Sequence, residues 1–329
     1  GVALGYQAGQ NNTEGIANVA IGYRALDVNT TGDTNIAIGY QALFANTTQD
    51  NTVAIGTYAL DANTTGAKNV AIGYMALSAN TTTSDCTAVG YGALKASEAS
   101  SNTGVGREAG TALSTGDHNT CLGNQALTTS TSGSSNVAIG SLAMQDGTSC
   151  GNNVAVGMKS LENITTGLDN VSVGWKCMDT NTTGSHSVAV GREALFNQTT
   201  GNYNVGIGMY AGYDITTSSN NTCVGYQAGR YQTAGGGSYF GWYAGRGRTA
   251  GDGNTGIGQY SMGNGAGDAG FNTGVGYAAL YALTTGDDNT CIGNSAGKEI
   301  TTGSNNLMLG KDAGRSNSPI GSVTTASND

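Results

Sequence analysis

A tripeptide that ends in glycine recurs along nearly the whole chain and constrains the fold more than any other feature. Successive copies are 17 residues apart, with two steps of 16 and one of 18. A pair of helices and its turns needs roughly 33 residues, so this unit is too short for a helical repeat. A fixed short period predicts stacked coils, each of which covers the apolar face of its neighbour. The marker glycines are Gly5, Gly22, Gly39, Gly56, Gly73, Gly90, Gly106, Gly123, Gly140, Gly157, Gly174, Gly191, Gly208, Gly225, Gly241, Gly258, Gly276, Gly293 and Gly310.

The most regular unit, residues 69–80, predicts how one coil is built. It reads Asn-Val-Ala-Ile-Gly-Tyr-Met-Ala-Leu-Ser-Ala-Asn, and a Thr-Thr corner follows. We expect a strand over residues 70–73, a second short segment over 74–77 and a turn at the Asn-Thr-Thr corner. The chain has a single proline, Pro319, which suits a fold in which nearly every backbone N–H bonds to the next coil.

These features predict an all-β protein. The fold class is a parallel β-solenoid, or β-roll, of about nineteen 17-residue coils over residues 1–314. Residues 315–329 carry no repeat and are expected to form an irregular polar C-terminal segment.

Strand alternation predicts which side chains face the interior. The residue before each marker glycine is apolar, and the residue two positions earlier is mainly Val, Ile or Thr. Since these two columns share one face of a strand, we assign them to the interior. The alanine between them then faces outward, and a flat apolar ribbon of this kind is typical of an interface. We therefore expect a closed oligomer of side-by-side subunits, a homotrimer or a homodimer, that packs through Ala20, Ala37, Ala54, Ala71 and Ala88. Alternatively, the coil is so thin that both strand faces are internal.

Charge and cysteine placement disfavour several classes of function. The net charge of −9 disfavours nucleic acid and anionic membranes as partners. The chain lacks an apolar stretch of about 18 residues, so membrane insertion is not expected. Cys121, Cys223 and Cys291 stand where other copies have alanine, which favours free thiols used as small apolar side chains. The sequence has no CxxC pair or Cys/His cluster, and we predict neither a metal site nor a cofactor.

Catalytic signals are weak. His118 and His186 lie in polar corners, and Asp33, Asp117 and Asp287 follow the Thr-Thr-Gly corner in only a few copies. Because no coil gathers two carboxylates and a base, we do not expect an enzyme, although a polysaccharide-cleaving β-helix remains an alternative.

The Asn-Thr-Thr corners recur at Asn29, Asn46, Asn63, Asn80 and Asn181. Stacked coils would place these asparagines in ladders whose amides bond to one another. The corners are also N-glycosylation acceptors if the chain is secreted by a eukaryote. Ice binding is a weaker alternative, because the adjacent threonines would point in different directions.

Aromatic residues become denser between Tyr203 and Tyr281. Exposed rings beside arginine suit stacking on sugars and contacts with acidic groups. Alternatively, the large side chains fill a wider or bent segment. The candidate glycan-binding residues are Trp242, Tyr243, Arg246, Tyr231 and Arg230.

The unit Asn-Val-Ala-Ile-Gly-Tyr-x-Ala-Leu, at 18–26, 35–43 and 69–77, resembles the repeats of trimeric autotransporter adhesin heads and, still more closely, the shafts of bacteriophage tail fibres. The resemblance implies a trimer of β-rolls that projects from a virion or a cell surface and supports attachment to a host glycan or receptor. It implies an extracellular or virion-surface location. A self-assembling extracellular filament, with subunits joined end to end, is the main alternative.

Overall fold

The computed structural model describes residues 1–247, 251–265 and 267–314. The predicted C-terminal segment, 315–329, lies outside the described residues. The chain divides into two compact units, residues 1–166 and 167–329. In the described parts of both units, every regular element is a three-residue strand.

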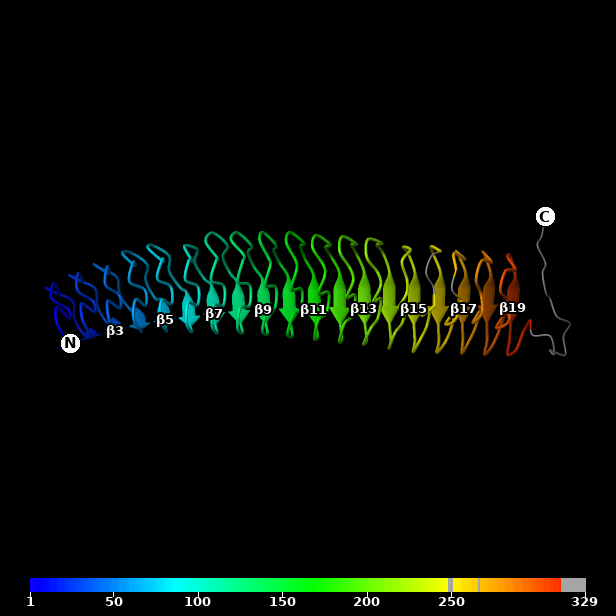
Figure 1. Ribbon diagram of the computed structural model, residues 1–329, viewed down its shortest axis with the longest axis horizontal. Coiled ribbons are helices and arrows are strands. Elements are labelled where there is room, and N and C mark those ends of the chain that lie inside the picture. The colour runs from blue at the N-terminus through cyan, green and yellow to red at the C-terminus, as the bar shows by residue number, and fades with distance from the viewer. Residues whose placement is uncertain (248–250, 266, 315–329) are drawn as a thin grey trace. The chain divides into compact units, whose positions relative to one another are not determined.

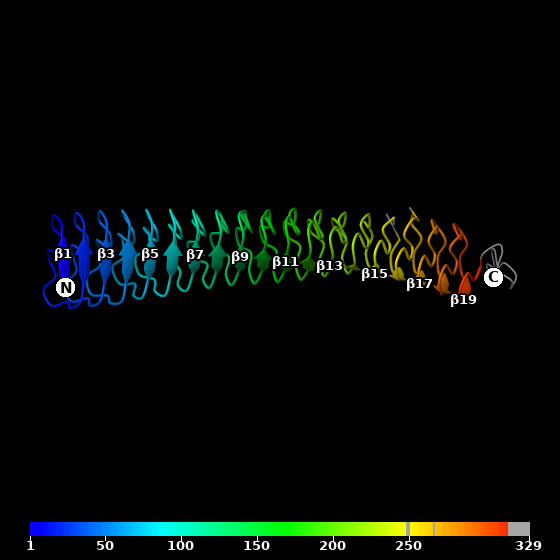
Figure 2. The same cartoon turned by 90° about the horizontal axis from the view of Figure 1, so that it is seen from below.

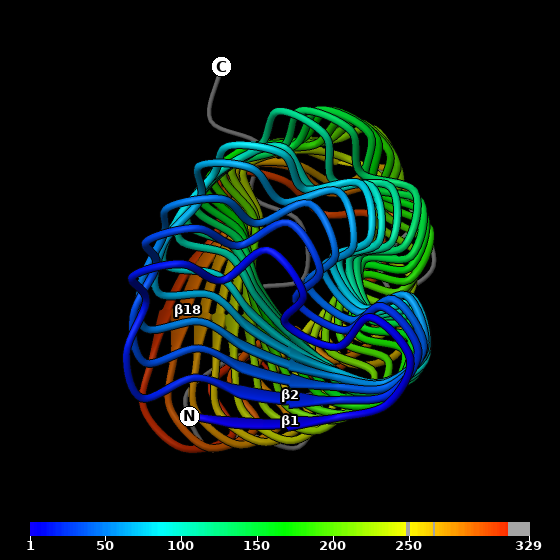
Figure 3. The ribbon, with the colours of Figure 1, turned by 90° about the vertical axis from the view of Figure 1, so that its left-hand side faces the viewer.

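Unit 1 is a parallel ladder of strands, one for each repeat (Figures 1 and 2). Each strand pairs with the next in a register of one repeat, so that Val53 lies opposite Val70 and Ala54 opposite Ala71. An end-on view shows β1 and β2 side by side (Figure 3). The strands are β1 (Val2–Leu4), β2 (Val19–Ile21), β3 (Ile36–Ile38), β4 (Val53–Ile55), β5 (Val70–Ile72), β6 (Thr87–Val89), β7 (Thr103–Val105), β8 (Thr120–Leu122), β9 (Val137–Ile139) and β10 (Val154–Val156).

Unit 2 repeats this arrangement, with each strand again parallel to the next. The all-β, parallel β-solenoid class is therefore confirmed in both units. The strands are β11 (Val171–Val173), β12 (Val188–Val190), β13 (Val205–Ile207), β14 (Thr222–Val224), β15 (Ser238–Phe240), β16 (Thr255–Ile257), β17 (Thr273–Val275), β18 (Thr290–Ile292) and β19 (Leu307–Leu309).

The predicted second segment is a turn rather than a strand. In the coil of β5, the marker glycine Gly73 has a φ of 134°, and Met75 and Leu77 have φ values of 54° and 51°. Two left-handed residues within three positions are incompatible with an extended segment. The chain thus leaves the strand at the glycine and reverses over residues 74–77, which carries Leu77 into the interior.

The predicted orientation of the strands was wrong. Ala20 is 2% exposed, and Ala37, Ala54, Ala71 and Ala88 are fully buried, so these side chains cannot form the outer interface assigned to them. The first and third residues of each strand face outward instead.

The leucine four positions after the marker glycine explains this orientation. Leu26, Leu43, Leu60, Leu77 and Leu94 are all fully buried. They occupy most of the coil interior, so only a small residue fits at the centre of the strand beside them. Where glycine stands in place of this leucine, a side chain from another position fills the same part of the interior. A Cβ at Gly212, for example, would lie 2.9 Å from Cδ1 of Ile215, which fills the vacated volume.

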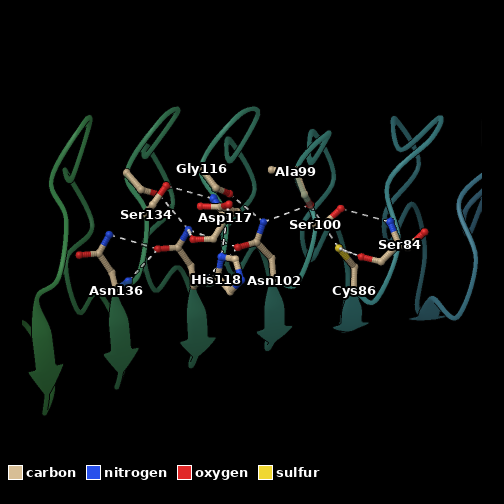
Figure 4. A network of polar contacts seen from close by, with 12 residues as sticks. Ser84, Cys86, Ala99, Ser100, Asn102, Gly116, Asp117, His118, Ser134 and Asn136 are labelled. Atoms are coloured by element: carbon tan, nitrogen blue, oxygen red, sulfur yellow. Dashed lines mark hydrogen bonds and ion pairs between the residues drawn. The ribbon is translucent and has the colours of Figure 1, made fainter.

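Buried asparagines before the strands link successive coils (Figure 4). The backbone N–H of Asn119 donates to Oδ1 of Asn102 at 2.9 Å, and that of Asn136 donates to Oδ1 of Asn119 at 3.0 Å. Each side-chain amide also donates across the coil, as Asn102 Nδ2 does to Gly116 O at 2.8 Å. This interior ladder satisfies polar groups that burial would otherwise leave unpaired.

The corner asparagines Asn29, Asn46 and Asn63 form a second ladder, as predicted, whereas the amides of Asn80 and Asn181 donate within their own corners. Asn46 Nδ2 donates to Oδ1 of Asn29 at 3.0 Å, and Asn63 Nδ2 donates to Oδ1 of Asn46 at 3.4 Å. These asparagines are fully buried. Their amide nitrogens are therefore inaccessible to glycosylation in the folded coil.

Candidate functional site

In each unit, the outward face of the strands is a largely apolar surface, which we call the strand face. It consists of the first and third residues of each strand, mainly Val, Ile and Thr. In unit 1, Ile72 is 37% exposed and Leu122 is 44% exposed, and in unit 2 Ile257 and Ile292 are 42% and 43% exposed. In-register pairing at about 4.8 Å per strand places like residues next to one another. Large contiguous apolar patches of this kind mark interaction surfaces.

The sequence predicted an apolar ribbon on the outer side of the strands, formed by the central alanine of each strand. The structure has such an apolar surface, but it is formed by the first and third residues of each strand. Alternation alone identifies two faces and does not say which one is internal. The missing signal was the column four positions after the marker glycine, which is leucine or methionine in most coils, because those side chains lie in the interior.

A stack of tyrosines follows the marker glycines of unit 1. The rings of Tyr6 and Tyr23 are 5.4 Å apart, and those of Tyr23 and Tyr40 are 5.1 Å apart, with interplanar angles of 14° and 8°. Tyr74 and Tyr91 stack in the same way at 5.2 Å. This exposed column was not among the candidate residues predicted from the sequence.

The five predicted glycan-binding residues lie in one cluster on unit 2. The rings of Trp242 and Tyr243 are 4.3 Å apart. The guanidinium of Arg246 lies 4.6 Å from the Tyr243 ring centroid and 5.7 Å from that of Tyr231, and the guanidinium of Arg230 lies 5.2 Å from that of Tyr231. Trp242 is 40% exposed, so its ring is accessible to a ligand.

This cluster is the centre of a longer row of rings and cations, which we call the aromatic seam. Towards lower residue numbers, the guanidinium of Arg230 lies 4.9 Å from the Tyr210 ring centroid, and that of Arg192 lies 4.6 Å from the Trp175 ring centroid. Towards higher numbers, Tyr260 lies 4.9 Å from Trp242. The seam is built mainly from the first, second and fifth positions after the marker glycine, so consecutive coils place these side chains side by side.

The cations of the seam face rings more often than carboxylates. Arg192 contacts Glu193 at 3.4 Å, whereas Arg230 and Arg246 have no carboxylate within ion-pair distance in the described part of the chain. Carboxylates lie close to a seam tyrosine at the low-numbered end. There, burial raises the pKa of Tyr213, and the nearby carboxylates of Glu193 and Asp214 raise it further.

Desolvation also raises the pKa of Tyr243, and neighbouring Tyr226 adds to the shift. The hydroxyl of Tyr243 is therefore neutral at physiological pH. It offers a ligand both a donor and an acceptor.

A shallow pocket of about 320 Å³ lies at the high-numbered end of the seam. Its lining residues are Tyr260, Tyr277, Ala278, Tyr281 and Lys298. The rings of Tyr277 and Tyr281 stand almost perpendicular to that of Tyr260, at 6.1 and 6.2 Å. The sequence did not indicate this pocket, because it arises where Ala278 follows Tyr243 and Tyr260 at the second position after the marker glycine.

The polar corner residues have structural roles. Oδ1 of Asp33 accepts the backbone N–H of Ile16 at 2.7 Å, and Oδ1 of Asp287 accepts that of Gly270 at 2.7 Å. The hydroxyl of Ser134 accepts the backbone N–H of Asp117 at 3.2 Å (Figure 4).

The two histidines each lie beside an aspartate. His118 Nδ1 is 3.3 Å from Oδ2 of Asp117, and His186 Nδ1 is 3.6 Å from Oδ2 of Asp169. The His186 ring also stacks on Tyr203, with ring centroids 5.0 Å apart. Across the described residues, no three His, Cys, Asp or Glu side chains group closely enough to hold a metal ion.

All six cysteines are free and buried, as the repeat positions predicted for Cys121, Cys223 and Cys291. Burial raises the pKa of Cys121, Cys223 and Cys291 from 9.0 to about 12. These thiols are therefore protonated and unreactive at neutral pH.

Comparison with protein-family models yields no match to the chain, and neither the curated proteins nor the solved structures contain a match. The described residues include no helix with the length and apolar character needed to cross a membrane.

Proposed function

We propose that this chain is a structural fibre segment that assembles with copies of itself through the strand face and projects a recognition surface from a virion or a cell. The strand face carries the proposal. A lone coil stack would leave its β-branched columns in water along the full length of each unit, at a cost of roughly 25 cal/mol per Å² of apolar surface. Burial against identical faces in a closed oligomer removes that cost, and we favour a trimer because the repeats resemble those of trimeric fibres.

A fibre role also suits the construction of the coil. Coils bond to their neighbours through the backbone, and many also do so through interior asparagines or, at the low-numbered end of unit 1, corner asparagines. Stability in such a stack comes from nearest-neighbour contacts, so the stack can be lengthened without a change in its design. The proposed location is extracellular or on the virion surface.

The assembly proposal is tested by placing charge on the strand face. A variant with Ile38→Lys, Ile55→Lys and Ile72→Lys puts three cations on consecutive strands. The matched control carries Thr48→Lys, Thr65→Lys and Thr82→Lys, which adds the same charge at exposed corner positions of the same coils. Sedimentation velocity is expected to show dissociation of the first variant only. Equal association states for both variants would contradict the proposal.

The aromatic seam supports a second part of the proposal, attachment to a host glycan. Its carrying observation is the exposed ring of Trp242 beside Tyr243 and Tyr260, because flat exposed rings stack on sugars. Trp242→Ala is expected to remove binding on a glycan array without changing the association state. Tyr23→Ala, which removes a similarly exposed ring from unit 1, is the control. Equal glycan binding by the two variants would contradict the assignment.

A further inference from the structure

We infer that the pocket at the high-numbered end of the seam binds an acidic sugar residue, with Lys298 as the group that recognises the acid. This inference rests on the proposed attachment role of the seam and specifies the chemistry of its ligand.

The pocket exists because one column of the repeat changes size. The second residue after the marker glycine is Tyr243 in one coil and Tyr260 in the next, and their rings stack at 5.5 Å with an interplanar angle of 26°. In the following coil this position is Ala278, and after it comes Ser295. The row of rings therefore stops at Tyr260, and Ala278, which is 3% exposed, forms part of the pocket wall beside it.

The walls of this opening suit a pyranose ring. Tyr260, Tyr277 and Tyr281 line it with aromatic surface, and the apolar C–H face of a sugar packs against such rings. Its volume of about 320 Å³ lies at the lower end of the range for small-ligand pockets, which fits one or two sugar residues rather than a large ligand. The neighbouring seam offers rings for the sugars on either side.

Lys298 gives the pocket its charge preference. Its Nζ lies 6.0 Å from the Tyr281 ring centroid, and the described residues place no carboxylate within ion-pair distance of it. The only acidic residue adjacent to it in the sequence is Glu299, which is exposed. An ammonium group on an aromatic wall, not neutralised by an ion pair, favours a carboxylate or sulfate on the bound sugar.

Titration calorimetry with paired probes tests this inference. The probes are an oligogalacturonate and an oligosialate, each with its methyl ester, and a sulfated oligosaccharide with its desulfated form. A charge-assisted contact predicts that at least one acidic probe binds about tenfold more tightly than its neutral counterpart. Carboxylated and sulfated probes distinguish the two sources of the anionic group.

Three variants locate the effect. Lys298→Gln is expected to remove the acid preference while weak binding of the neutral form persists. Ala278→Tyr fills the pocket, and tyrosine is compatible with the backbone here because Tyr243 and Tyr260 have φ values of 59° at the same repeat position. Binding should be lost in this variant with no fall in melting temperature. Lys95→Gln, an exposed lysine at the equivalent repeat position in unit 1, is the control and should bind as the wild type does.

The outcomes separate the inference from the function on which it rests. Equal affinity for acidic and neutral probes, with binding abolished by Trp242→Ala, would overturn the acid preference and leave the attachment role standing. Unchanged acid preference in Lys298→Gln or unchanged binding in Ala278→Tyr would overturn the pocket assignment. No binding of any probe to the wild type would overturn both.

Discussion

The ring of Tyr239 occupies the interior volume that a side chain at Gly245 would need. A Cβ added at Gly245 would overlap the Tyr239 ring, and Tyr239 is the largest fully buried side chain. In the regular coil these two positions are alanine and leucine, as in Ala71 and Leu77. The coil of β15 thus reaches the same packing with the large and small residues exchanged.

This exchange predicts that substitutions at Tyr239 and Gly245 compensate for each other in stability. Tyr239→Ala should destabilise unit 2 by about 3–5 kcal/mol, the usual cost of removing a buried aromatic ring. Gly245→Leu should also destabilise, because the new side chain meets the ring. The double variant restores the regular coil and should recover most of the loss, which chemical denaturation will measure. Simple addition of the two losses would contradict this packing account.

The marker glycines predict a second effect on stability. Gly39 has a φ of 136°, a region that only glycine adopts readily, and a Cβ there would lie 2.6 Å from the carbonyl oxygen of Gly56. Gly39→Ala should therefore lower the free energy of unfolding by more than about 2 kcal/mol. Gly310→Ala is the control, because its Cβ would meet nothing within 4 Å and only the backbone strain remains. Equal losses would show that the clash has no role.

A stabilising substitution is expected at Thr34. This β-branched residue has a φ of 57°, where such side chains are strained. Asn51 and Asn152 hold the same repeat position with φ values of 58° and 56°, and asparagine tolerates this conformation. Thr34→Asn should raise the free energy of unfolding by about 0.5–1 kcal/mol. Thr87→Asn, at an ordinary strand position, should instead lower it, and a gain in both variants would contradict the strain argument.

The buried thiols predict a dependence of stability on alkaline pH. Burial raises the pKa of Cys223 to about 12 from 9.0, so between these values the unfolded thiol ionises and the folded one does not. The unfolded state then binds fewer protons, and stability falls as the pH rises above about 9. Cys223→Ala, which installs the usual residue of this column, should reduce the slope of that fall. An unchanged slope would contradict the assignment.

The same burial predicts slow chemistry at neutral pH. The six native thiols should not react with a thiol reagent at pH 7 until the chain is denatured, when all six should react. Rapid modification of any cysteine in the native protein would show that its coil opens.

The repeat predicted the architecture because each coil repeats the same local pattern. The marker glycines predicted one strand per repeat, the Asn-Thr-Thr corners predicted turns, and the repeat positions of Cys121, Cys223 and Cys291 predicted free thiols. Orientation was harder to predict. In β5, alternation places Val70 and Ile72 on the same face of the strand but does not say whether that face is internal. A turn with two left-handed residues carries Leu77 into the interior, and Ile72 faces outward. The cluster around Trp242 was predicted from residue type and density, whereas the pocket beside Lys298 depends on one short residue, Ala278, and its neighbours in adjacent coils.

The molar mass of the unmodified protein tests the central claim, self-assembly through the strand face, most directly. Light scattering on a size-exclusion column over a range of concentrations will report how many 32.9 kDa chains associate. The account predicts a stable multiple of that mass, with three chains at about 99 kDa, three times 32.9 kDa, as the expected species. A mass of one chain at every concentration would contradict it, and the ice-binding alternative would then be tested by thermal hysteresis.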